Sequence, residues 1–380
     1  GLALAWGLLG GEEDVGRRAP PERSARLVEV VPAVPRSHTV SVTAWGEVLP
    51  ARRLDLRPRV SGRVMALGDG FEPGTVVSAG TPLLRLDPQD YRLALERARS
   101  ALTRAKADLA LEQGRQAVAR REFELLGEDV EDAERGLILR QPQLQTAQAA
   151  VTSAEADLSD ARLDLERTTI EAPFDALVLA RDVSPGTEVS ASSTLAELVG
   201  VDTWWVELQV PAGALRWIRF PDEGGAGSPV TLSYQGVWPE GTTRAGRVLR
   251  LRGDLADQGR LARVLVAVED PLARGDEAAG RPRLLLGAFM QAEIAGRSLD
   301  GAVAMEPQWL HAGDTVWIMN DAGELEIRPV EVAYRDTRRV LVTGGIGRGE
   351  RIVTSQLSAP VAGMPLRAAP ADGGDRASGD

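Results

Sequence analysis

Two long stretches in the middle of the 380-residue chain repeat apolar residues every seven positions. The first series places Leu95, Leu102, Leu109, Gln116 and Phe123 at one repeat position and Tyr91, Ala98, Ala105, Glu112, Ala119 and Leu126 at the offset position. The second places Val130, Leu137, Leu144, Val151, Leu158 and Leu165 at one position and Ala133, Arg140, Ala147, Ala154 and Ala161 at the other. Each series lasts about five heptads, which is typical of a coiled coil rather than a single amphipathic helix.

A short turn joins the two helical stretches, because only Gly127, Glu128 and Asp129 separate the series. Gly127 can end the first helix and Asp129 can cap the second. A turn this short makes the helices antiparallel neighbours. We therefore predict a hairpin over residues 88–169, with arms of about 37 residues and about 55 Å.

Polar and proline residues interrupt this pattern. Pro142 removes one backbone hydrogen bond, so the second helix either kinks there or restarts there with Pro142 in its first turn. The unbroken heptads favour the kink. Gln116, Glu112 and Arg140 occupy inward positions; they either set the register between the arms or mark a distal half that opens to pack against other proteins.

One short motif occurs on both sides of the predicted hairpin. FEPGTVVSAGTPLLRL (residues 71–86) and VSPGTEVSASSTLAEL (residues 183–198) match at eight of sixteen positions. Each copy has a PGT turn between short strand-like runs, and neither alone could bury its apolar face. Because antiparallel arms of equal length return to one place, we predict that the copies pair as two halves of one small sandwich domain.

Composition excludes several classes of function. The net charge of -11 argues against nucleic-acid binding. There are no cysteines, which excludes disulfides and thiol chemistry, and the two histidines, His38 and His311, lie far apart. The only lysine is Lys106, so neither half of the predicted sandwich can carry a lipoyl or biotinyl lysine.

The N-terminal run GLALAWGLLG is apolar but shorter than the roughly 20 residues that span a bilayer. We interpret residues 1–26 as the remainder of a signal peptide or membrane anchor followed by a charged linker, with a buried N-terminal helix as the alternative.

Three other features have simpler explanations than a ligand site. The glycine-rich run 344–349 resembles a phosphate-binding loop, but no helix follows it, so a hairpin turn is expected. Trp204, Trp205 and Trp217 are expected to pack in strands and cores. The five methionines are too scattered for a soft-metal site.

Three stretches of the sequence resemble the periplasmic adaptors, or membrane fusion proteins, of RND-type efflux systems. They are VSGRVMALGDGFEPGTVVSAGTPLLRLDPQDY, then ARLDLERTTIEAPFDALV, and then LLLGAFMQAEIAG with GDTVWIM, IRPVEV and GERIVTS. They occur in the family's order and extend over most of residues 50–365.

The resemblance implies a mixed α and β, multidomain and elongated fold. Its expected parts are a membrane-proximal β domain (27–58 plus 299–368), a lipoyl-like barrel-sandwich domain (59–87 plus 170–200), the α-helical hairpin (88–169), a β-barrel domain (201–298) and a disordered tail (369–380). It also implies a subunit without catalytic activity or cofactor that assembles, commonly as hexamers. Its implied partners are an inner-membrane RND transporter and an outer-membrane channel, and its implied location is the periplasm of a Gram-negative bacterium, attached to the inner membrane through the N-terminal segment.

The predicted hairpin tip departs from the family's usual pattern. Residues 122–134 contain seven acids and lack the Arg-Leu…Ser signature with which many family members dock their channel. The candidate docking residues are therefore this chain's own: Glu124, Leu126, Gly127, Glu128, Asp129, Glu131 and Asp132. The other interpretation of the acids is a solvated turn.

Two other functions use related parts. An adaptor of an ABC-type exporter or type I secretion system would have the same hairpin and sandwich. A lipoyl or biotin carrier subunit would have the sandwich, but the missing lysine disfavours it. A coiled-coil scaffold would not explain the split motif.

Overall fold

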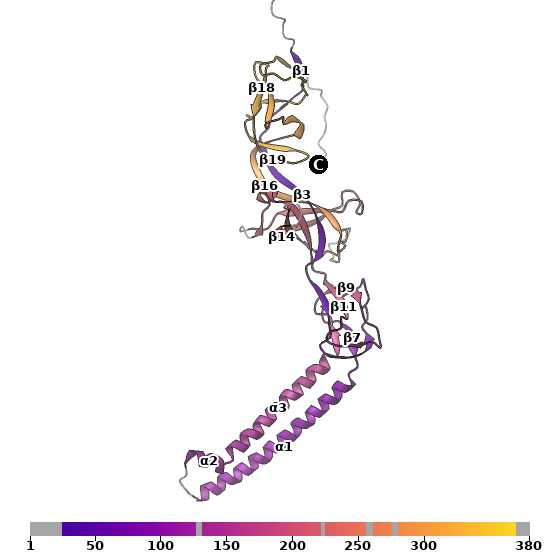
Figure 1. The fold of residues 1–380 in the computed structure, drawn as a ribbon, viewed down its shortest axis with the longest axis vertical. Helices are drawn as coiled ribbons and strands as arrows, with labels where there is room; N and C mark the ends of the chain where they lie inside the picture. The colour runs from indigo at the N-terminus through magenta and orange to yellow at the C-terminus, as the bar shows by residue number, and fades with distance from the viewer. Residues whose placement is uncertain (1–24, 127–130, 222–224, 256–260, 276–279, 370–380) are drawn as a thin grey trace, which may run out of the picture. The chain divides into compact units, whose positions relative to one another are not determined.

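The computed structural model describes residues 25–126, 131–221, 225–255, 261–275 and 280–369 (Figure 1). The chain divides into two compact units. One comprises Gly1–Val42 and Ala295–Asp380, and the other comprises Thr43–Ile294. Strands β3 (Arg36–Pro50) and β16 (Phe289–Met305) carry the chain from one unit to the other. The mixed α and β fold class predicted from the sequence is confirmed, whereas the finer division into four domains stays a prediction.

The predicted hairpin is present, and its seam follows the heptads. Helix α1 (Gln89–Leu126) lies beside α3 (Gln141–Glu166), and the short helix α2 (Asp132–Ile138) lies near their distal end (Figure 1). In α1 every repeat position from Tyr91 to Phe123 is buried or half-buried, whereas the residues between them are exposed. In α3 the same holds from Leu144 to Leu165, with only Asp164 joining them. This one-sided burial is what a two-helix coiled coil requires.

The second arm does not kink at Pro142, so the interpretation that the heptads favoured is wrong. Helix α2 ends at Ile138, and α3 restarts at Gln141 with Pro142 in its first turn. Arg140 between them has a left-handed backbone, with φ 54° and ψ 30°. A proline costs no hydrogen bond in a first turn but breaks one inside a helix, and this difference outweighs the continuous heptad pattern.

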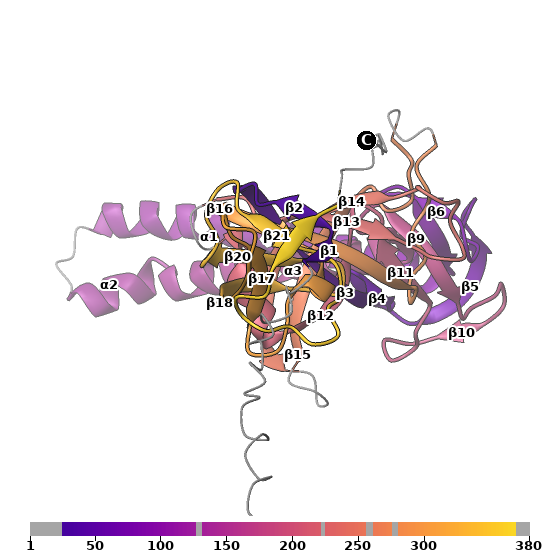
Figure 2. The same ribbon diagram turned by 90° about the horizontal axis from the view of Figure 1, so that it is seen from above.

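The two halves that contain the motif copies combine into one domain, as predicted. One sheet has the order β10-β5-β7-β8 and the other β4-β11-β9-β6, so each contains strands from both sides of the hairpin. Figure 2 labels β5 and β10 of the first sheet and the four strands of the second. The strands are β4 (Arg53–Leu56), β5 (Gly62–Leu67), β6 (Val76–Val77), β7 (Pro82–Leu86), β8 (Thr169–Glu171), β9 (Ala176–Arg181), β10 (Glu188–Val189) and β11 (Ala196–Gly200).

Each PGT turn binds a strand that precedes the other copy, β9 or β5. The Gly74 N–H donates to the Val178 carbonyl at 2.8 Å, and the Gly186 N–H donates to the Val64 carbonyl at 2.8 Å. Both glycines have positive φ, 88° and 92°, which explains why a glycine stands in each turn. The leucines that end each copy are buried together in one core: Leu83, Leu84, Leu86, Leu195 and Leu198. These hydrogen bonds and the shared core join the two halves into one domain.

The same unit contains a closed β-barrel. Its strands follow the order β13-β14-β15-β12-β3-β16, and an additional pairing of β13 with β16 completes the ring. The remaining bounds are β12 (Thr203–Pro211), β13 (Pro229–Ser233), β14 (Arg244–Leu255) and β15 (Leu261–Glu269). Along β12 the buried residues alternate, from Trp204 to Val210, as expected of a strand with one face in a barrel core.

The other unit consists of short strands from both chain ends. One sheet has the order β18-β17-β21-β2, and β1 pairs in parallel with β22. The bounds are β1 (Arg26–Val28), β2 (Val30–Pro32), β17 (Thr315–Met319), β18 (Leu325–Pro329), β19 (Glu331–Arg335), β20 (Val340–Gly344), β21 (Arg351–Val353) and β22 (Leu366–Ala368).

The segment 27–58, expected in a single domain, is divided between the two units. The unit boundary falls after Val42. Beyond it, residues 45–50 pair with β12 of the barrel, and β4 pairs with β11 of the sandwich. Backbone pairing with strands more than a hundred residues away therefore assigns these residues to the larger unit.

Candidate docking site at the end of the hairpin

The residues predicted to dock a partner lie at the distal end of the hairpin. Glu124 is exposed in the last turn of α1, and Glu131 is exposed immediately before α2. Leu126 is the last residue of α1 and Asp132 the first of α2. Gly127, Glu128 and Asp129 lie outside the described residues. The structure thus brings the described members of the set to one end of the hairpin.

The charge at this end is mixed. Glu122 and Glu134 are exposed together with Glu124 and Glu131, but Arg120 and Arg121 are exposed one turn earlier on α1. Opposite charges one turn apart on a helix partly offset each other, so the acidic character is strongest at the tip itself.

The sequence interpretation missed an apolar stripe on the outer face of α1. Leu111, Val118 and Leu125 follow each other at seven-residue spacing and are 61%, 58% and 86% exposed. On α2, Leu137 and Ile138 are also exposed. The spacing of the first three was a usable signal, because residues seven apart share one face of a helix even when that face is turned away from the seam. Clustered exposed apolar side chains are typical of interaction surfaces.

Three polar residues meet across the seam where the second arm breaks. The Arg140 guanidinium donates from Nε to Glu112 Oε1 at 2.6 Å and from Nη2 to Glu112 Oε2 at 3.1 Å. The Gln116 side-chain amide donates to the Leu139 carbonyl at 3.1 Å. We call Glu112, Gln116 and Arg140 the break clasp. Of the two interpretations left open by the sequence, contact between the arms is the one observed.

The charged groups of the break clasp stabilise each other. Glu112 is 7% exposed, and Arg115 adds a further contact to it at 3.4 Å. Hydrogen bonding to Arg140 lowers the pKa of Glu112, and the same bond raises the pKa of Arg140. Two-pronged pairing of a guanidinium with a carboxylate also fixes the relative orientation of the two helices that carry them.

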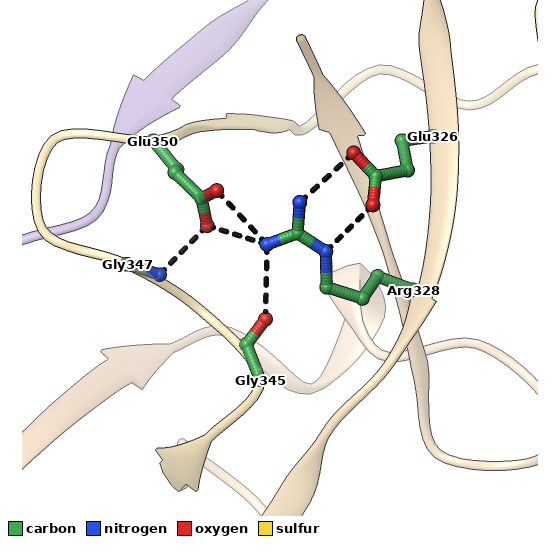
Figure 3. A network of polar contacts seen from close by, with 5 residues as sticks. All are labelled: Glu326, Arg328, Gly345, Gly347 and Glu350. Atoms are coloured by element: carbon green, nitrogen blue, oxygen red, sulfur yellow. Dashed lines mark hydrogen bonds and ion pairs between the residues drawn. The ribbon is translucent and has the colours of Figure 1, made fainter.

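A phosphate site in the glycine-rich run is excluded by what fills the turn (Figure 3). Arg328 donates to Glu326, to Glu350 and to the Gly345 carbonyl, and Glu350 accepts the Gly347 N–H at 2.7 Å. These bonds to Glu326 and Glu350 raise the pKa of Arg328, and the bond to Arg328 lowers the pKa of each carboxyl. The predicted hairpin turn is wrong, because the run joins β20 to β21, which belong to two different sheets. The Gly347 N–H in this connection is occupied by the Glu350 side chain.

Potential metal ligands are dispersed in the part of the chain that the structure describes. Within those ranges, no three His, Cys, Asp or Glu side chains lie close enough together to hold a metal ion. His311 stacks on Trp317 with ring centroids 3.6 Å apart, and burial lowers its pKa. Its geometry is that of a packed imidazole rather than a ligand.

Comparison with known proteins points to one family. The family described as "RND MFPs, C-terminal permuted SH3 domain" matches residues 302–359, which contain β17 to β21. "Multidrug resistance protein MdtA" of Cronobacter turicensis is 25% identical over 353 residues, covering 91% of this chain and 81% of that protein. The MdtA of Escherichia coli O139:H28 is 25% identical over 348 residues, covering 89% and 79%. The chain is thus similar to multidrug resistance proteins over nearly its whole length, and its residues 302–359 match the C-terminal domain of the RND-type membrane fusion proteins.

Solved structures of membrane fusion proteins share the fold. MacA from Actinobacillus actinomycetemcomitans superimposes with a TM-score of 0.60 at 17% identity, covering 86% of this chain and 99% of MacA. A MacA–MexA chimera with the α-hairpin domain of Pseudomonas aeruginosa MexA gives a TM-score of 0.57 at 19% identity. At this identity the likeness concerns the fold alone.

Proposed function

We propose that this membrane fusion protein is the periplasmic adaptor subunit of a tripartite RND-type efflux pump, linking an inner-membrane transporter to an outer-membrane channel. The observation that carries the proposal is the similarity to the MdtA multidrug resistance proteins along 91% of the chain. The C-terminal family match at residues 302–359 supports it independently.

The adaptor role is mechanical and carries no covalent chemistry. The sandwich is built like a lipoyl carrier but has no lysine, so it serves as the base of the hairpin. Tyr91 in the first turn of α1 donates to the Ser61 carbonyl at 2.7 Å, and the Leu86 N–H donates to the Thr168 carbonyl at 2.8 Å. These bonds support a firm connection between the sandwich and both ends of the hairpin.

The distal end of the hairpin docks the channel in this proposal. The exposed acids Glu124 and Glu131 would face a basic rim, with Glu128 and Asp129 of the connecting turn completing the contact. Charge complementarity of this kind steers the encounter and sets the register of binding more than it adds affinity. The exposed Leu125 next to these acids would supply apolar area at the same contact.

Two further parts of the proposal follow from the family. The protein would assemble with itself, commonly as a hexamer. The N-terminal segment would attach it to the inner membrane. Among the residues that the structure describes, no helix combines the length and the apolar character needed for a membrane span.

The proposal is tested by crosslinking in living cells from a photoreactive residue at Glu128, with the captured partner identified by mass. We expect an outer-membrane channel protein, and we expect deletion of the adaptor to abolish export. A photoreactive residue at the exposed Leu163 of α3 is the matched control on the same hairpin. Co-purification of an ATPase in place of an RND transporter would favour the ABC-exporter alternative. Normal export without the protein would contradict an adaptor role.

A further inference from the structure

Leu137 lies outside the seam between the two arms, although the heptad pattern predicts that it lies inside. It stands seven residues before Leu144, which is half-buried in the seam, and residues seven apart lie on one face of a continuous helix. Yet Leu137 is 63% exposed, and its neighbour Ile138 is 44% exposed. The left-handed backbone of Arg140 lies between Leu137 and Leu144 and turns the earlier residues away from the seam.

The break is strained at one residue. Arg140 follows the end of α2, in the position where helices usually place a glycine, because a side chain is disfavoured in the left-handed region. Pro142 favours the break but does not require this conformation of Arg140, since a kinked helix also accommodates a proline. Other contacts must therefore stabilise the left-handed residue.

The break clasp supplies those contacts. The Leu139 carbonyl accepts from Gln116, and in a continuous helix the same carbonyl would accept from the N–H of Gln143. At the break, the bond from Gln116 therefore satisfies a carbonyl that a continuous helix would satisfy from its own backbone. Arg140, the strained residue itself, is tied to Glu112 by two bonds from the opposite helix.

We propose that the break clasp is a conformational latch. It holds the second arm in the broken form, with Leu137 and Ile138 on the outer surface of the hairpin end. Without it, α2 and α3 join into one kinked helix, and Leu137 enters the seam that the heptads assign to it. Glu112 and Gln116 act as positioning residues, since they determine the direction of α2 without belonging to it.

Thiol labelling tests the latch directly, because the chain has no cysteine. The full protein carrying Leu137→Cys is treated with a maleimide, and the rate is compared with that of Leu125→Cys, a site on α1 that is 86% exposed. We expect both thiols to react at similar rates. Adding Gln116→Leu and Arg140→Leu removes the clasp and places helix-forming apolar residues in the seam. The thiol at position 137 is then expected to react at least about tenfold more slowly, as a site does when it is reached only through local opening.

Arg140→Gly is the decisive control. It removes the clasp to Glu112 but lets the left-handed conformation form without strain, so the thiol at position 137 should stay reactive. Far-UV circular dichroism and an unchanged rate at position 125 establish that each variant is folded. Protection of the thiol at position 137 in the parent would overturn the proposal, as would an unchanged rate in the Gln116→Leu, Arg140→Leu variant or slow labelling in Arg140→Gly. None of these measurements needs a partner, so their outcome is independent of the proposed docking.

Discussion

The two arms of the hairpin have equally regular heptads but different helices. The first arm is one helix of 38 residues, whereas the second is divided into helices of 7 and 26 residues. The α1 residues Glu112 and Gln116 face the break on the opposite arm and bond to it. Periodicity therefore decides which face of an arm turns inward, but it does not decide whether the arm is continuous. That depends on Pro142 and on the polar groups that bond to the ends created by the break.

The largest loss of hairpin stability is expected when a proline is placed in the unbroken arm. Ala110 is exposed in the middle of α1, so Ala110→Pro removes a backbone hydrogen bond without disturbing the seam. We expect the hairpin to lose about 3 kcal/mol of local stability or more, because α1 has no clasp that would stabilise a break there. Amide hydrogen exchange along α1 measures the loss. Ala110→Ser at the same site is the control, and near-parental protection in the proline variant would contradict the contrast between the arms.

A second test compares the two sides of the break. Leu144→Ala removes a half-buried seam side chain and is expected to cost the hairpin about 1–2 kcal/mol, less than a fully buried leucine. Leu137→Ala, seven residues earlier, removes an exposed side chain and should change stability by less than about 0.5 kcal/mol. Hydrogen exchange of α3 gives both values. Equal losses would show that Leu137 packs in the seam after all.

Acid should weaken the break clasp in a predictable direction. The folded pKa of Glu112 lies below the ordinary glutamate value of 4.5, chiefly through its bond to Arg140. A lowered folded pKa means that the carboxylate stabilises the hairpin above pH 4.5, and that this contribution is lost as the pH falls through the folded value. We expect amide protection near Leu139 to fall over this range. Glu112→Gln should have weaker protection at neutral pH and a flatter acid profile. Asp157→Asn, at an exposed position of α3, is the control and should show the acid profile of the parent.

The smallest effect on stability is expected at the tip. Glu128→Ser with Asp129→Ser removes two charges from the connecting turn and should leave the thermal unfolding of the protein unchanged. In cells we expect weaker crosslinking to the channel and weaker export, with the remaining contact less sensitive to salt. Glu96→Ser with Asp108→Ser on the proximal part of α1 is the matched control. Parental crosslinking and export in the tip variant would identify the acids as a solvated turn.

The repeated motif shows what the sequence could establish and why. The two copies share their turn residues and their terminal leucines, so each predicts a half-domain of the same structure. The heptads of the two arms predict an antiparallel hairpin, which brings the two halves together. Local patterns suffice here because they recur. The tip residues Glu124 and Glu131 could be placed at the hairpin end for the same reason, since their position follows from the length of the arms.

The sequence by itself determined the hairpin, the inward face of each arm and the union of the two half-domains, because period and repetition are local properties of a chain. Only the tertiary structure decided the break at Arg140, the division of the chain after Val42 and the closure of the barrel through β3 and β16. Each of these depends on bonds between residues far apart in sequence, such as Gln116 with Leu139 or β3 with β12. Such long-range bonds pair backbone N–H and C=O groups whose partners cannot be read from the local sequence pattern. They can therefore stabilise a conformation other than the one that the pattern favours.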